Sequence, residues 1–199
     1  MRILLPAALL LLSAAPLAAQ DGYGGYGGPT GNWSGSYVSG SLGFGRTASS
    51  SSAAGPTVSV SDISTGFSVA AGHQVQSGSI VYGGEIAIFD VTGDLGPVGA
   101  NLGVDFGLRA AARVGYDLGE SMVYGTVGLA RADFNGAGID EHDNALTVGA
   151  GIDLKVTDRI NLGAEYMHYR FGEVSGAAGA GAPADVNLGT LGLKVTYGF

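Results

Sequence analysis

The feature that most constrains this chain is a regular alternation of apolar residues with small or polar ones over residues 145–172. Every second residue of the first half is apolar, namely Leu146, Val148, Ala150, Ile152, Leu154 and Val156. The residues between them are small, polar or charged, namely Thr147, Gly149, Gly151, Asp153 and Lys155. After Thr157-Asp158 the alternation resumes, with Leu162, Ala164, Tyr166 and His168 on one face. Because successive side chains of a strand point to opposite faces, the pattern predicts two strands joined by a tight turn.

Each of these strands is about ten residues long, which is the length that a tilted strand needs to cross a bilayer. The face that is not apolar carries glycine, threonine and isolated charges instead of bulky polar side chains. Such a face suits the narrow, packed interior of a small membrane barrel. The hairpin therefore predicts a barrel whose apolar face meets lipid.

The composition agrees with a membrane barrel and excludes several other classes. Charged residues make up 13% of the chain, and 37 of its 199 residues are glycine, whereas soluble domains contain about 25% charged residues and about 7% glycine. A hydrophobic content of 46% argues against a disordered chain. The formal net charge of −8 and the lack of a basic cluster argue against nucleic acid as a partner. Without cysteine, neither disulfides nor thiolate metal sites are expected.

The N-terminal residues predict an exported protein. Residues 1–20 contain Arg2, an apolar run and then small residues, which is the pattern of a cleaved signal peptide. A helical membrane anchor is the rival interpretation, but the apolar run is short and Pro6 interrupts it. Residues 21–32 predict a flexible leader rich in glycine and tyrosine. No later stretch has roughly 18 consecutive apolar residues, so residues 33–199 are expected to cross a membrane as a barrel.

Alternating segments recur through the rest of the chain and predict an all-β, eight-stranded, antiparallel, up-and-down transmembrane barrel. The strands are expected at 33–44, 65–74, 80–89, 105–116, 122–131, twice within 145–172, and at 187–199. Four long connections separate them, at 45–64, 90–103, 132–144 and 172–186, and the connections between these are short. Short turns on one rim and long loops on the other are typical of outer-membrane barrels. We therefore expect the turns to face the periplasm and the loops to face the cell exterior.

Several strings resemble the opacity-type and outer-membrane-protein-A-like barrels of Gram-negative bacteria. They include WSGSYVSGSLGFG, IVYGGEIAIF, AARVGYDLGESMVYGTVGLA, LTVGAGIDLKVTDRINLGAEYMHYRFG and the terminal LGLKVTYGF. The resemblance extends from Trp33 to the end of the chain. It implies the outer membrane as location, with the lipid bilayer and lipopolysaccharide as surroundings. It also implies that Tyr197 and Phe199 form the assembly signal that the barrel-insertion machinery reads.

Inward-facing charges are the most informative candidate site. Glu85, Arg113, Glu165 and Lys194 are expected in one layer of the lumen, with Asp153 and Lys155 nearer the turns and Arg109 nearer the loops. Because buried charges must be paired, these seven residues predict a nearly charge-balanced network that plugs the barrel. The resemblance likewise implies interior charges at the positions of Glu85, Arg113 and Asp153. A structural role is favoured over a catalytic one.

The histidines do not indicate catalysis or metal binding. His73 and His168 are expected on the outward face, and His142 lies in an acidic loop that lacks the spacing of a calcium site. A barrel enzyme acting on lipid would need a nucleophilic serine beside a histidine, and the residues around His168 supply none. A lipocalin-like binding barrel would need an apolar lumen, which Lys194 and Thr196 oppose. No cofactor, metal or catalytic residue is predicted.

Together these patterns predict a non-enzymatic outer-membrane barrel with a structural or surface-interaction role, in which the loops could contact an extracellular ligand. A small passive pore for ions or solutes is the alternative.

Overall fold

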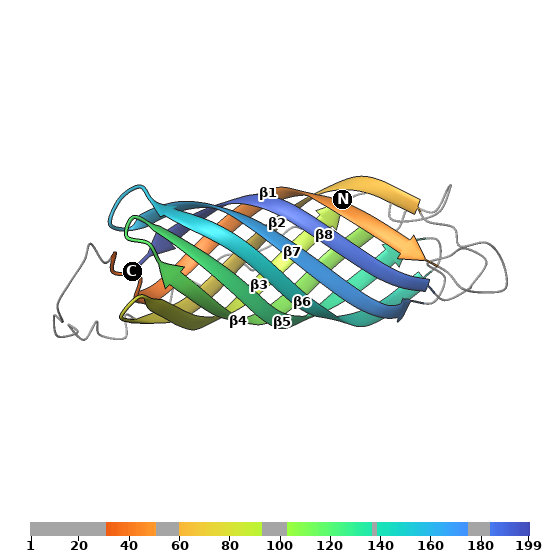
Figure 1. Cartoon of the computed structure of the whole chain (residues 1–199). Helices are drawn as coiled ribbons and strands as arrows, with labels where there is room; N and C mark the ends of the chain where they lie inside the picture. Colours follow the sequence, from red (N-terminus) through yellow and green to blue (C-terminus); the bar gives the residue numbers. More distant parts are fainter. Residues whose placement is uncertain (1–30, 51–59, 93–102, 137–138, 175–183) are drawn as a thin grey trace.

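Eight strands form a closed antiparallel barrel in the computed structural model, which describes residues 31–50, 60–92, 103–136, 139–174 and 184–199 (Figure 1). The strands are β1 (Gly35–Ser50), β2 (Val60–Ser77), β3 (Ile80–Thr92), β4 (Gly103–Asp117), β5 (Ser121–Gly136), β6 (Ile139–Lys155), β7 (Ile160–Val174) and β8 (Ala184–Gly198). Each strand pairs with its neighbours in sequence, and β8 closes on β1. The predicted fold class and strand number are confirmed. Among the described residues no helix is both long and apolar enough to cross a membrane.

Alternation along each strand sets which residues face the lumen. In β6, Leu146 and Leu154 are exposed on the outer wall, whereas Thr147 and Asp153 are buried inside. The same division holds in β5. Both faces of this strand contain apolar residues, and Leu129 lies on the outward one. The predicted hairpin is confirmed as β6 and β7, which pair from Ala145↔Phe171 to Lys155↔Asn161. One strand therefore presents one face to lipid and the other to the barrel interior.

The strands are longer than predicted at the end where the long connections lie. The predicted loop 132–144 is wrong, because β5 and β6 remain paired from Arg131↔Asn144 to Gly136↔Ile139. The predicted loop 45–64 likewise contains the end of β1 and the start of β2, and β3, β4, β7 and β8 extend into 90–103 and 172–186. These extensions are rich in serine, threonine and aspartate, so hydrophobic alternation does not reveal them. Backbone hydrogen bonds extend the ladder regardless of side-chain polarity.

Other parts of the predicted connections, at 51–59, 93–102, 137–138 and 175–183, lie outside the described residues, as do the predicted signal peptide and most of the leader. The first strand also begins later than predicted, at Gly35 instead of Trp33. Gly35 has a φ of +138°, a backbone conformation that residues with a Cβ rarely adopt. The chain thereby changes direction between Trp33, whose side chain is buried, and the barrel wall.

The two ends of the barrel differ. At the turn end, strands are joined through residues 78–79, 118–120 and 156–159, and the chain terminates at Phe199. The backbone nitrogen of Phe199 donates to the carbonyl oxygen of Ser36 at 3.0 Å, which completes the seam between β8 and β1. The opposite end, where β1 joins β2 and β7 joins β8, is called the loop end below. In outer-membrane barrels the short turns face the periplasm and the longer loops face the exterior.

Candidate functional site in the barrel lumen

Charged side chains from β3, β4, β6, β7 and β8 meet inside the barrel. The first half of the cluster centres on Arg109, whose Nη2 lies 2.5 Å from Oε1 of Glu85. Its Nη1 lies 3.8 Å from Oε1 of Glu165. Glycine surrounds Glu165 in the ladder, because Gly151 and Gly192 are its partners on the two adjacent strands. The absence of neighbouring side chains lets the Glu165 carboxylate reach across the lumen.

The second half of the cluster centres on Asp153, which pairs with two cations. Arg113 donates to Oδ2 of Asp153, and Nζ of Lys194 lies 3.1 Å from Oδ1. Asp153 and Lys194 are on β6 and β8, two strands apart, and both pair with Gly163 of the intervening β7. Because Gly163 has no side chain, the two charges meet across that strand. Lys194 also lies 3.8 Å from Glu165, which joins the two halves into one chain of three acids and three bases.

Two tyrosines, which sequence reasoning did not identify, complete this network. The Tyr37 hydroxyl donates to Glu85 at 2.9 Å. The Tyr124 hydroxyl donates to Glu165 at 2.8 Å and accepts from Lys194 at 2.5 Å. The Arg113 guanidinium lies 3.5 Å from the centroid of the Tyr124 ring, a cation–π geometry. Alternation along β1 and β5 places both tyrosines on the lumen side, and this was the sequence signal for them. A search limited to charged residues does not detect it.

Lys155 is not part of this network, contrary to the prediction. Its Nζ donates to the backbone oxygen of Asn32 at 2.6 Å and lies 4.7 Å from the centroid of the Trp33 ring. The indole nitrogen of Trp33 donates to Asp117 at 2.9 Å, and its backbone oxygen accepts from Gln74 at 2.6 Å. The last strand residue before the turn is too near the mouth to reach the buried acids. Lys155 instead holds the segment that precedes β1 against the turn end.

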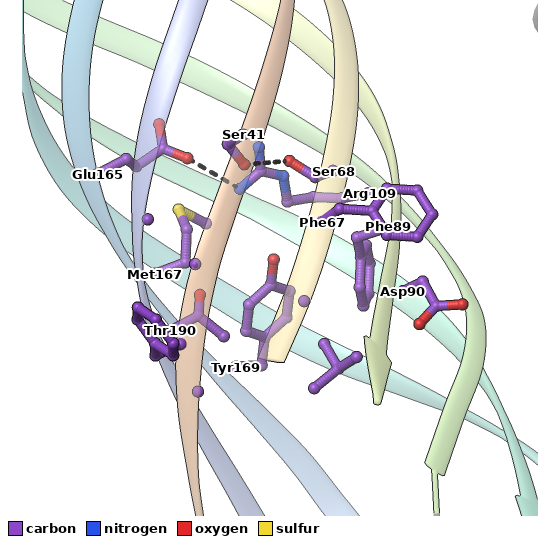
Figure 2. A pocket seen from close by; sticks show the side chains of 16 residues that line it. Ser41, Phe67, Ser68, Phe89, Asp90, Arg109, Glu165, Met167, Tyr169 and Thr190 are labelled. Carbon is purple, nitrogen blue, oxygen red and sulfur yellow. Dashed lines mark hydrogen bonds and ion pairs between the residues drawn. The ribbon is translucent and has the colours of Figure 1, made fainter. Parts of the chain in front are cut away.

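Aromatic and aliphatic side chains fill the lumen on the other side of the charges. The rings of Phe89 and Tyr169 lie 5.1 Å apart, and those of Tyr169 and Phe171 lie 6.4 Å apart. Met167 and Leu188 are buried nearby on β7 and β8. Figure 2 shows Arg109 and Glu165 on one side of Met167, Tyr169 and Phe89. An apolar layer therefore lies between the charged network and the loop end.

Two cavities lie on either side of the Lys194 contacts. The one at the turn end has a volume of about 560 Å³ and extends from Trp33 and Lys155 to Arg113 and Asp153. The other, drawn in Figure 2, has a volume of about 50 Å³ and is lined by Arg109, Glu165 and the neighbouring apolar residues. None of the described residues lines both cavities. Each of them ends at the charged network.

The outer wall carries the remaining residues singled out from the sequence. Tyr197 and Phe199 are exposed at the turn end with ring centroids 5.2 Å apart in an edge-to-face arrangement. His73 is exposed, and its Nδ1 lies 3.1 Å from Oγ of Ser36. This serine–histidine pair was missed, because its members come from β1 and β2. Gly84, the partner of His73 on β3, and Ala112, the partner of Gly84 on β4, supply no carboxylate to orient the imidazole.

His168 is half-buried beside exposed Tyr166, whereas the side chain of His142 lies outside the described residues. Within the described ranges, no group of three or more histidines and acids is arranged to hold a metal ion.

The closed barrel, its apolar exterior and its charged interior define an outer-membrane β-barrel. The family model of the outer membrane protein beta-barrel domain matches residues 6–199, and the chain belongs to this family. The protein is thus located in the outer membrane, as predicted.

Similar proteins support this assignment. The chain is 31% identical over 182 residues to the 25 kDa outer-membrane immunogenic protein of Brucella abortus, and the match covers 86% of this chain and 80% of that protein. It is 33% identical over 108 residues to the 22 kDa outer membrane protein of Rhizobium leguminosarum, covering 52% and 51% of the two chains. Among solved structures, Neisserial surface protein A aligns with a TM-score of 0.56 and 20% identity, over 83% of this chain and 98% of that one. That structural likeness supports the fold alone.

Proposed function

We propose that this protein is a non-enzymatic outer-membrane barrel with a structural or surface-interaction role, and that its own side chains seal the lumen. The observation that carries the proposal is that the two lumen cavities share no lining residue. Between them lie the contacts of Lys194 with Asp153 and Glu165. Solutes larger than water would have to displace a paired charge in order to pass.

The charges favour a plug because they are paired in equal numbers. Separating one ion of a buried pair from its partner is expected to cost roughly 3–5 kcal/mol. An eight-stranded barrel has an interior about wide enough for its own side chains. The aromatic layer of Phe89, Tyr169 and Phe171 adds a second barrier that contains no charge to attract ions. Both barriers would have to open together for steady transport.

A small passive pore is the second candidate function, and the cavity of about 560 Å³ at the turn end favours it. Within the described part of the chain, three buried polar atoms beside that cavity have no hydrogen-bond partner, namely Nε of Arg113, Oε1 of Gln74 and Oγ1 of Thr196. Water that solvated these atoms would wet the lumen at the turn end. The difference between plug and pore therefore depends on the charged network and the aromatic layer.

A liposome-swelling assay tests the proposal. Vesicles that contain the wild-type protein should swell in isotonic arabinose no faster than vesicles without protein. Swelling that increases with the amount of folded protein would reject the seal and establish the pore.

The surface role rests on the loop end. Segments within 45–64, 90–103, 132–144 and 172–186 lie at the end that faces the exterior in barrels of this class. We propose that they contact an extracellular ligand, and that the apolar wall contacts the bilayer and its lipopolysaccharide. Whole-cell binding assays with deletions in each segment test the first part. Binding that no deletion alters would reject it.

We also propose that Tyr197 and Phe199 are read during assembly by the barrel-insertion machinery. Both side chains are exposed on the last strand, and Phe199 is bonded to β1 through its backbone. Truncation of Phe199 should lower the inserted fraction several-fold at low expression, as measured by fractionation. Replacement of the equally exposed Phe44 by alanine is the control and should leave insertion unchanged. Equal insertion of the truncated and wild-type chains would contradict this role.

A further inference from the structure

The basic residues of this acidic chain fall into distinct groups. Arg109, Arg113 and Lys194 are buried in the lumen, and Lys155 and Arg159 are at the turn end. Arg2 lies outside the described residues. The remaining three of the nine basic residues are all exposed on the outer wall toward the loop end, namely Arg46, Arg131 and Arg170. They lie on β1, β5 and β7, and are called the arginine arc.

The strand register brings these three residues to one level of the barrel. A path through directly paired residues begins at Val38, passes once around all eight strands, and returns to β1 at Ala48, ten residues nearer the loop end. The intermediate residues of this path are Ala71, Ile86, Ala110, Leu129, Leu146, Arg170 and Asn187. Residues at equal height on adjacent strands are therefore offset by about 1.25 residues from direct pairing.

Arg170 is connected through Asn187 to Ala48, two strands away. Two strands of stagger amount to two to three residues, so the residue of β1 level with Arg170 lies that far from Ala48 toward the turn end. This is residue 45 or 46, and Arg46 points outward there. The same correction from Arg131 through Asn144 leads to residue 169 or 170 of β7. The three arginines thus occupy alternate strands along one arc, about 10 Å apart because adjacent strands are about 4.8 Å apart.

The direct partners of the arc in the strand ladder carry no negative charge. The paired residues on adjacent strands are not acidic, namely Ile63 and Gly189 for Arg46, Leu108 and Asn144 for Arg131, and Leu146 and Asn187 for Arg170. Among the side chains that the structure describes, no ion pair involves any of the three arginines.

Large apolar side chains begin directly beneath the arc. Phe44 and Leu129 lie two residues nearer the turn end than Arg46 and Arg131, and both are strongly exposed on the lipid-facing wall. The arc therefore marks the boundary between the apolar band and the polar extensions of the strands. A charge is tolerated at this depth, since arginine on the lipid face costs about 0–1 kcal/mol near the interface.

We propose that the arginine arc binds the phosphate groups of a phosphorylated glycolipid in the outer leaflet of the membrane. A guanidinium group offers a planar fork of donors that matches phosphate oxygens, and it remains charged at every physiological pH. Three such groups at one height suit a headgroup with more than one phosphate. This inference rests on the proposed contact between the barrel wall and lipopolysaccharide, and it assigns that contact to particular residues.

Binding of bisphosphorylated lipid A to the full protein in zwitterionic detergent tests the proposal. The triple variant R46Q/R131Q/R170Q should bind at least tenfold more weakly than the wild type. The double variant K155Q/R159Q, altered at the turn end, should bind as the wild type does. Dephosphorylated lipid A should bind the wild type and the triple variant equally and weakly. Millimolar inorganic phosphate should not displace bisphosphorylated lipid A from the wild type.

Heat-modified gel migration verifies that each variant is folded, and the variant R46K/R131K/R170K preserves the charges if the glutamine variant does not fold. In that case the lysine variant should bind two- to tenfold more weakly than the wild type, because ammonium groups lack the fork. Wild-type affinity in the folded glutamine variant, or in the lysine variant used in its place, would overturn the proposal. If the wild type bound dephosphorylated lipid A as tightly as bisphosphorylated lipid A, that result would overturn the proposal as well. Failure of the lumen seal would appear as swelling in vesicles and would leave lipid A binding unaltered, so the two proposals fail separately.

Discussion

The lumen and the outer wall of this barrel are made by alternate residues of the same strands, yet they obey opposite rules. In β8, Lys194 is 4% exposed and paired with Asp153, whereas its neighbour Leu193 is 75% exposed. A soluble protein would reverse both positions. The comparison shows that burial in the fold and contact with an apolar environment are separate properties in a membrane barrel. A buried charge needs a partner on another strand, while an exposed leucine needs only lipid.

The largest effect is expected when a shared lumen partner is removed. Replacement of Asp153 by asparagine leaves both Arg113 and Lys194 without their closest acid. We expect a loss of roughly 3–5 kcal/mol in the free energy of unfolding. Urea titration in lipid vesicles measures it. Asp158→Asn makes the same chemical change in an exposed turn and should alter stability by less than about 0.5 kcal/mol. Equal losses in the two variants would show that the lumen charges are not effectively buried.

A smaller difference is expected between leucines on opposite faces of β8. Leu188 is buried among lumen side chains, so Leu188→Ala should leave a cavity and cost about 2–5 kcal/mol. Leu193→Ala faces lipid, which fills the vacated space, so only the transfer of its methyl groups is lost. That loss should be about 1–2 kcal/mol. Urea unfolding of both variants in the same vesicles measures the two losses. A larger loss for Leu193→Ala than for Leu188→Ala would contradict the assignment of Leu188 to the lumen and Leu193 to the lipid-facing wall.

The fluorescence of Trp33 reports on the packing of the turn end, and this measurement needs no substitution. It is the single tryptophan of the sequence, and its ring is buried against Val81, Met122 and Tyr124. Its fluorescence should be blue-shifted in the folded protein and poorly quenched by acrylamide, and both properties should disappear in urea. Emission like that of a water-exposed indole in the folded state would contradict its position in the lumen mouth.

The smallest effect is expected on the outer wall. Arg170→Gln removes an exposed charge that pairs with no described side chain, so in vesicles without phosphorylated glycolipid its unfolding free energy should change by less than about 0.5 kcal/mol. Addition of bisphosphorylated lipid A should raise the unfolding free energy of the wild type more than that of Arg170→Gln. A large loss without that lipid would indicate a structural role instead.

Much of this organisation is predictable because alternation is a local property of the chain. Leu129 and Leu146 could be placed on the outer wall, and Glu85 and Arg113 inside, from parity alone. The pairing of charges could not be predicted, because it depends on strand stagger. Asp153 meets Lys194 only since Gly163 lies between them in the register. Thr157 and Asp158 marked their turn, but the polar ends of β5 and β6 carried no apolar signal.

The lumen glycines show a second limit of sequence reasoning. Gly151 could be interpreted as leaving open space for water. A Cβ at this position would instead lie 2.5 Å from Cζ of Tyr124, so the glycine makes room for an aromatic ring from the adjacent strand. Which neighbour fills such a gap depends on register and rotamer, and neither is visible in the sequence.

Conductance across a planar bilayer tests the sealed lumen most directly. The wild-type protein should show little or no steady current, because the charged network and the aromatic layer both block the path. Arg113→Ala should produce flickering openings, since it leaves Asp153 with Lys194 alone, whereas Arg159→Ala at the exposed turn should behave as the wild type. Stable, uniform wild-type channels that Arg113→Ala leaves unaltered would contradict the seal.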